Sequence, residues 1–155
     1  ALTFADQVVV MQDGEVVQIG TPVELFERPA HTFVGHFIGS PGMNVLVAEM
    51  RDGGAFLGGH HVALEGKVTT STGAPQIGIR PEFVKIGDAG LPATVRKVSD
   101  IGRHSVVEAM VGDISVKAVT EGAVPEQGAA IHLKFQQDQT RLYRDGWLAT
   151  EGAAS

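Results

Sequence analysis

The hydrophobic positions follow two different patterns, which change near residue 40. Before that point, residues 2–5 are typical of the end of a helix. An uninterrupted apolar run at Val8–Met11 then predicts a strand covered on both faces, as in α/β sheets. After that point, apolar and polar residues alternate along short runs, which indicates strands with one buried face. We therefore predict an α/β remnant over residues 1–39 and a separate β-rich domain over residues 40–155.

The N-terminal part carries clear turn and helix signals. Asp13-Gly14 favours a type I′ hairpin turn, because that turn needs positive φ angles. Thr21 is placed to cap a helix that begins at Pro22, and Glu24 lies where a capping box needs a carboxylate. Apolar residues return at helical spacing over residues 31–38. We expect a hairpin followed by two short helices.

The C-terminal domain is predicted to consist of strands joined by glycine-rich turns. Residues 39–42, with the sequence Gly-Ser-Pro-Gly, are the best linker candidate, and Gly53 belongs to an expected turn. Many short strands at this spacing are typical of a sandwich or a small barrel. The expected strands are Val45–Met50, Ala55–Leu57, His61–Leu64, Gln76–Arg80, Phe83–Ile86, Ala93–Val98, Ser105–Val111, Ile114–Val119, Ala130–Phe135 and Thr140–Tyr143.

Composition narrows the class of protein. Hydrophobic residues make up 43% of the chain, and the formal net charge is −6. The negative charge argues against a nucleic-acid partner, whose phosphates require a basic surface. The absence of cysteine excludes disulfides and thiol chemistry and fits a reducing compartment. No apolar run approaches the roughly 18 residues of a membrane-spanning helix. Because the chain starts on Ala1 rather than Met, we expect it to be part of a longer protein.

The histidines are the only residues that suggest a metal site. His60 and His61 could combine with His104 or His132 around an ion. Adjacent residues in a strand point to opposite faces, however, so His60 and His61 cannot share one metal. We predict neither a metal site nor catalytic residues in this chain.

Two features are candidates for contact with a ligand or a partner. One is a polar loop between two expected strands, because binding residues are often carried on loops. The other is the pair Tyr143 and Trp147, which would stack on a base or a sugar if exposed. For the loop, the simpler interpretation is a solvated turn. For the two aromatic residues, it is packing in the core. The loop residues are Asp100, Gly102, Arg103 and His104.

The most specific signals are two stretches of sequence that occur in a fixed order. The first consists of Leu2–Met11, Asp13–Pro22, Phe33-Val34, Phe37–Pro41 and Met43-Asn44, and the second of Gly78, Ile79, Arg80, Pro81 and Glu82. The first stretch resembles the end of the nucleotide-binding domain of ABC importer ATPases. The closest branch is that of carbohydrate uptake, which includes the maltose and glycerol-3-phosphate importers. The second resembles an element of the regulatory TOBE domain of the same branch.

The resemblance implies a mainly β fold, with an OB-like small barrel of short antiparallel strands after a short α/β remnant. It also implies that the parent protein binds ATP and Mg elsewhere. Family members hold nucleotide with a Gly-rich loop containing Lys and Ser/Thr, a signature loop, acidic residues and a switch His. None of these motifs occurs in the sequence, and the family order places Ala1 just after the switch His. This chain alone is therefore predicted to need no cofactor and to have no ATPase activity.

The function implied by the resemblance is that of a regulatory and dimerisation region. The implied partners are a second copy, across a two-fold axis, and membrane permease subunits at the cytoplasmic face. One alternative is a stand-alone domain that binds a small solute or an oxyanion. Another is an OB-type nucleic-acid binder, which the charge disfavours. We also expect residues 1–39 to be less well packed, or rearranged against a second copy of the chain, whereas residues 44–155 should fold independently.

Overall fold

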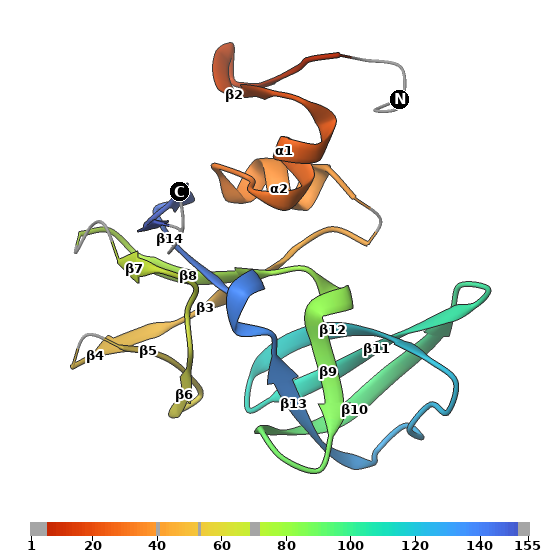
Figure 1. Cartoon of the computed structure of the whole chain (residues 1–155). Helices are drawn as coiled ribbons and strands as arrows, with labels where there is room; N and C mark the ends of the chain where they lie inside the picture. Colours follow the sequence, from red (N-terminus) through yellow and green to blue (C-terminus); the bar gives the residue numbers. More distant parts are fainter. Residues whose placement is uncertain (1–5, 40, 53, 69–71, 152–155) are drawn as a thin grey trace.

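The computed structural model describes residues 6–39, 41–52, 54–68 and 72–151 (Figure 1). The helix end expected at residues 2–5, Ser40 of the expected linker and Gly53 of an expected turn lie outside the described residues. Figure 1 shows a hairpin and two helices at one end of the molecule and a larger β-rich part at the other. Among the described residues, no helix has both the length and the apolar character required to cross a membrane.

The hairpin consists of strands β1 (Val8–Gln12) and β2 (Glu15–Gly20). Positive φ angles of 51° at Asp13 and 79° at Gly14 confirm the predicted turn. Only one face of β1 is covered, because Val10 is buried whereas the next residue on each side of it is more than half exposed. The prediction of a strand covered on both faces is therefore wrong for the described chain.

Helix α1 (Pro22–Glu27) begins at the predicted cap. The hydroxyl of Thr21 accepts a hydrogen bond from the backbone N–H of Glu24 at 3.2 Å. The same hydroxyl donates to the Glu24 carboxylate at 3.1 Å. The cap is thus confirmed, although the carboxylate binds the hydroxyl instead of the Thr21 backbone N–H that a capping box uses.

Helix α2 (Thr32–Phe37) begins with a cap that the sequence did not suggest. The Nδ1 nitrogen of His31 accepts a hydrogen bond from the backbone N–H of Phe33 at 3.0 Å. Between the helices and the hairpin lies a small hydrophobic cluster, hereafter the small core. It consists of Val10, Leu25, Val34 and Ile38.

The β-rich part contains antiparallel sheets of five, four and three strands and one two-stranded ladder. The five-stranded sheet has the order β12 (Ile114–Glu121), β11 (His104–Val111), β10 (Leu91–Asp100), β13 (Ala130–Phe135) and β9 (Val84–Gly87). The four-stranded sheet has the order β15 (Trp147–Leu148), β14 (Arg141–Arg144), β8 (Pro75–Ile79) and β3 (Asn44–Val47). The remaining strands are β4 (Glu49–Arg51), β5 (Gly54–Leu57) and β6 (His60–Val62), with β16 (Thr150–Glu151) paired to β7 (Lys67–Val68).

These strands confirm the predicted fold class. Every expected strand overlaps an observed one, and the expected run over residues 45–50 is divided between β3 and β4 by Ala48. The short strands β7, β15 and β16 were not predicted, because two-residue strands carry no recognisable pattern. The described strands form separate sheets and do not close into one barrel.

The main hydrophobic core lies between these sheets and includes Leu57, Ile77, Val107 and Leu133. Asn44 joins two of the sheets through its side-chain amide. It accepts the backbone N–H of Lys117 at 2.9 Å and donates to the Lys117 carbonyl at 2.8 Å. This pair of bonds satisfies a buried amide and fixes β3 against β12.

Candidate functional site

The most distinctive site lies where strand β8 meets the two helices, and it is organised by Arg80. Only 4% of this arginine is exposed. Its Nε donates to the carbonyl of Phe26 at 2.9 Å. Its Nη1 donates to the carbonyls of Ile38 at 2.6 Å and Gly35 at 3.2 Å. The guanidinium also lies 4.0 Å from the centroid of the Phe26 ring, a cation–π contact.

The position of these carbonyls explains why a buried cation is tolerated. Phe26 lies near the end of α1, and Gly35 and Ile38 lie near the end of α2, where carbonyls lack partners within the helix. A positive charge is favourable at a helix C-terminus, and the last turn of α1 contains no basic residue of its own. Arg80 therefore caps both helices from the β-rich part. Burial lowers the pKa of Arg80, and the negative charge of Glu82 opposes this shift.

The other residues of the G-I-R-P-E element have structural roles. A Cβ atom at Gly78 would lie only 2.5 Å from the ring of Tyr143, so a side chain there would displace that ring. Ile79 is fully buried in the main core. Pro81 begins a 3₁₀ helix over Pro81–Phe83, and Glu82 is the acidic residue of its first turn. The element thus positions Arg80 at the end of β8.

Tyr143 makes a second connection between the two parts of the molecule. Its hydroxyl donates a hydrogen bond to the carbonyl of Pro29 at 2.7 Å, and its side chain is fully buried. The interpretation of Tyr143 as an exposed stacking residue is therefore wrong. Burial raises the pKa of Tyr143. Trp147 is half exposed, and its ring contacts His31 edge-on, with the ring centroids 4.6 Å apart.

A third connection is formed by two arginines on either side of one carboxylate. Glu65, whose side chain is 14% exposed, forms an ion pair with Nη2 of Arg28 and another, at 2.9 Å, with Nε of Arg141. Arg28 follows α1, whereas Arg141 belongs to β14. Because the pairs are partly shielded from solvent, this network contributes more to the junction than exposed ion pairs would.

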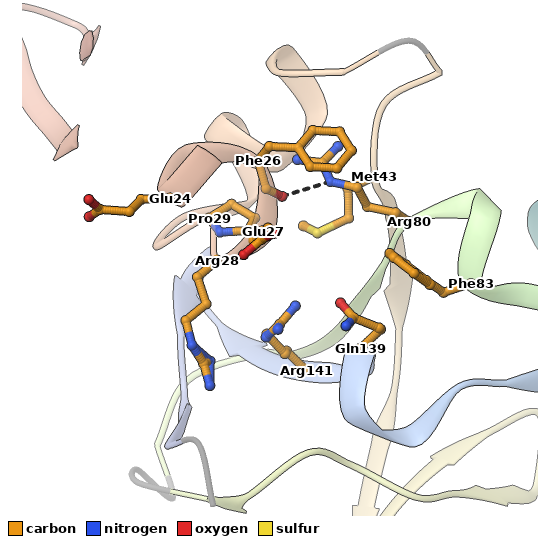
Figure 2. A pocket seen from close by; sticks show the side chains of 10 residues that line it. All are labelled: Glu24, Phe26, Glu27, Arg28, Pro29, Met43, Arg80, Phe83, Gln139 and Arg141. Carbon is orange, nitrogen blue, oxygen red and sulfur yellow. Dashed lines mark hydrogen bonds between the residues drawn. The ribbon is translucent and has the colours of Figure 1, made fainter. Parts of the chain in front are cut away.

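A cavity of about 330 Å³ opens at this junction (Figure 2). The helical side of its wall comes from α1 and the residues that follow it. The β side comes from β14, from the residues just before β3 and just after β8, and from the 3₁₀ helices Pro81–Phe83 and Gln137–Gln139. Figure 2 shows the guanidinium of Arg141 and the amide of Gln139 pointing into this space. The lining residues are Glu24, Phe26, Glu27, Arg28, Pro29, Met43, Arg80, Phe83, Gln139 and Arg141.

The polar loop suggested as a contact site lies elsewhere, in the hairpin between β10 and β11. The carboxylate of Asp100 accepts the backbone N–H of Gly102 at 3.0 Å. His104 forms a contact of 2.6 Å between Nε2 and the Glu121 carboxylate. Arg103 is exposed at the tip. None of these residues lines the cavity, and their role in binding stays a prediction.

Sequence reasoning missed the residues that join the two parts. Arg28, Glu65 and Arg141 gave no motif, and Tyr143 was expected to pack in the core, with no hydrogen bond to the helical part foreseen. One signal was available, because Arg141 begins an apolar strand and a charge at a buried strand position requires a partner. Among the described residues, no three His, Asp or Glu side chains are grouped in a way that would hold a metal.

Comparison with known proteins agrees with the resemblance to ABC importer ATPases and their TOBE domain. The family model of the TOBE domain matches residues 77–142, which run from β8 to β14 and include the G-I-R-P-E element. The chain is 41% identical over 129 residues to an uncharacterized ABC transporter ATP-binding protein of Sinorhizobium fredii. That match covers 80% of this chain and 35% of the relative.

Two further relatives have more specific names. An sn-glycerol-3-phosphate import ATP-binding protein of Vibrio vulnificus is 38% identical over 92% of this chain and 41% of its own length. An alpha-glucoside transport ATP-binding protein of Rhizobium meliloti is 32% identical over 92% of this chain and 42% of its own length. The chain thus spans roughly two-fifths of the length of these relatives, and the similarity extends across the junction between the helices and the sheets.

Proposed function

This chain is a TOBE-domain relative of the ATP-binding proteins of ABC importers, and on that premise we propose that it is a regulatory and dimerisation region. The parent protein would be the ATP-hydrolysing subunit of an importer for sugars, polyols or glycerol phosphates. The names of two relatives support glycerol phosphates and sugars among these classes. ATP and Mg would be bound by the parent, because this sequence contains no Gly-Lys-Ser/Thr loop.

The observation that carries the proposal is the pair of helices held by Arg80. A regulatory domain must be mechanically connected to the ATPase whose activity it adjusts. Residues 1–39 resemble the end of the ATPase domain, and within them the backbone carbonyls of Phe26, Pro29 and Ile38 are bound directly by Arg80 or Tyr143. A displacement of the TOBE domain would therefore be transmitted to those residues without passing through a flexible linker.

The proposed partners follow from the same role. A second copy would bind through the TOBE region across a two-fold axis, which gives a symmetric interface. Permease subunits would contact the ATPase domain of the parent, at the cytoplasmic face of the membrane. The net charge of −6 gives no support to a nucleic-acid partner.

Sedimentation equilibrium tests the dimerisation role. We expect the purified chain to self-associate reversibly as its concentration rises, and a strictly monomeric chain at the highest soluble concentration would contradict the proposal. A coupled ATPase assay provides the complementary measurement. The chain alone should show no turnover, whereas a measurable rate would contradict the assignment of nucleotide binding to other parts of the parent.

A further inference from the structure

Three arginines, Arg28, Arg80 and Arg141, line the cavity at the junction, whereas its two glutamates, Glu24 and Glu27, are exposed to solvent. Arg80 and Arg141 are only 4% and 9% exposed, and Arg28 lies beside them. Glu65 is the only carboxylate for which an ion pair with any of these three arginines is found among the described residues. Arg80 instead uses backbone carbonyls, and its Nη2 is buried without a hydrogen-bond partner. A buried guanidinium nitrogen without an acceptor is costly, so the inner wall favours a ligand that supplies anionic oxygens.

Arg141 provides free donors that face the open space. Its Nε is within 2.9 Å of Glu65, but none of the described residues accepts a hydrogen bond from its Nη1 or Nη2. Figure 2 shows this end of the guanidinium directed into the cavity, with the Gln139 amide beside it. Two parallel N–H groups of a guanidinium match the geometry of a phosphate or carboxylate edge.

We propose that this cavity is an anion-binding site, in which the free nitrogens of Arg141 and the amide of Gln139 hold a phosphate group or a similar small oxyanion. The volume of about 330 Å³ lies within the range of ligand sites and admits a phosphate group together with water. The site does not depend on the transporter role, because it rests only on the arginines and the cavity. An occupant would contact both parts of the molecule and hold the junction closed.

The rim of the cavity has the opposite charge and sets its selectivity. Glu27 lines the cavity from the end of α1 and is exposed to solvent. Its carboxylate repels an incoming anion, although solvent partly screens the repulsion. A negative charge added at Gln139 should therefore weaken anion binding, and removal of the negative charge at Glu27 should strengthen it.

Calorimetric titration of the full chain with inorganic phosphate, at constant ionic strength, tests the site. Saturable binding is expected for the unmodified chain. Gln139→Glu should weaken it at least about tenfold, because like charges repel strongly in a partly enclosed site. Glu27→Gln should strengthen it about two- to fivefold, because the rim charge is more exposed and its repulsion weaker. Circular dichroism establishes that both variants remain folded, and Glu27→Gln keeps the test decisive if Gln139→Glu does not fold.

Two matched variants control for net charge. Gln127→Glu adds the same charge in the exposed loop between β12 and β13, and Glu15→Gln removes one at the exposed first residue of β2. Both should bind phosphate as the unmodified chain does. The inference is overturned if phosphate does not bind saturably, or if the cavity variants and their controls behave alike.

Sulfate and methyl phosphate distinguish the possible sources of the anion. Tighter binding of methyl phosphate than of inorganic phosphate would support a phosphomonoester as the occupant. Tighter binding of inorganic phosphate would support the free ion, and a preference for sulfate over both would support a fully ionised oxyanion. If none of the three anions binds in competition with the others, the site is refuted.

Discussion

The two hydrophobic cores of this molecule differ in size and in what encloses them. The main core is surrounded by sheets of five, four and three strands. Among the described residues, the small core has four buried members, Val10, Leu25, Val34 and Ile38, with a few partly buried apolar side chains packed against them, below a hairpin whose outer face is exposed. So few buried side chains cannot offset the conformational entropy of ordering about thirty residues. The helical segment therefore depends on its polar connections to the sheets, which are Arg80, Tyr143 and the Glu65 network.

The largest loss of stability should come from truncating a buried leucine in either core. Leu25→Ala and Leu133→Ala remove side chains that are at most 1% exposed. Each should lower the free energy of unfolding by about 2–5 kcal/mol, because the lost methyl groups leave a cavity. If the polar connections couple the cores, urea unfolding shows one transition in both variants. A Leu25→Ala variant whose main transition is unchanged would show that the helical segment unfolds separately.

Arg80→Lys should be the next most damaging change. Lysine keeps the charge but cannot reach three carbonyls at once, so helix-terminal carbonyls lose charged partners that are worth about 1.5–3 kcal/mol each. We expect a loss of about 2–3 kcal/mol in urea unfolding, with faster hydrogen exchange in α1 and α2 than in the five-stranded sheet. Arg96→Lys is the matched control, because Arg96 is exposed on β10. Equal losses in the two variants would contradict the capping role.

Tyr143→Phe tests the second connection. Removing the hydroxyl leaves the Pro29 carbonyl without its donor and should cost about 1 kcal/mol in urea unfolding. An unchanged stability in Tyr143→Phe would indicate that the hydroxyl contributes nothing to the junction.

The pKa of Tyr143 also predicts a response to alkaline pH. Because burial raises this pKa above its ordinary value of about 10, the unfolded chain ionises first. The contribution of neutral Tyr143 to the free energy of unfolding is therefore complete below pH 10 and is lost as the pH rises further. Tyr143 is the only tyrosine, so absorbance at alkaline pH reports its ionisation directly. A normal titration near pH 10 in the folded chain would contradict the burial.

The smallest effect concerns His31 and low pH. Burial lowers the pKa of His31 from its ordinary value of 6.5, and a protonated Nδ1 cannot accept the Phe33 N–H. The His31 cap therefore contributes fully to the free energy of unfolding above pH 6.5. This contribution, of about 1 kcal/mol or less, is lost as the pH falls. His31→Asn keeps an acceptor at the cap but does not titrate, so it should remove this pH dependence. Fluorescence of Trp147, the only tryptophan, reports the change.

Local features of the fold were predictable from the sequence, whereas the junction was not. Asp13-Gly14 and Thr21 determine their turn and cap through neighbouring backbone, so their sequence signals suffice. Glu65 binds arginines that lie 37 and 76 positions away in the sequence, and no local pattern records such a pairing. The G-I-R-P-E element was recognised, but the partners of Arg80 are backbone carbonyls, which every residue has.

The distance along the chain between the joined residues determines when the junction can form during synthesis. The carbonyl of Pro29 can be bound only after the hydroxyl of Tyr143, 114 residues later, has been synthesised. Arg80 is separated from its partner Phe26 by 54 residues. Closing such long loops is entropically costly and is deferred until other contacts exist. The helices are made first on the ribosome, yet they become locked only after β14 has emerged.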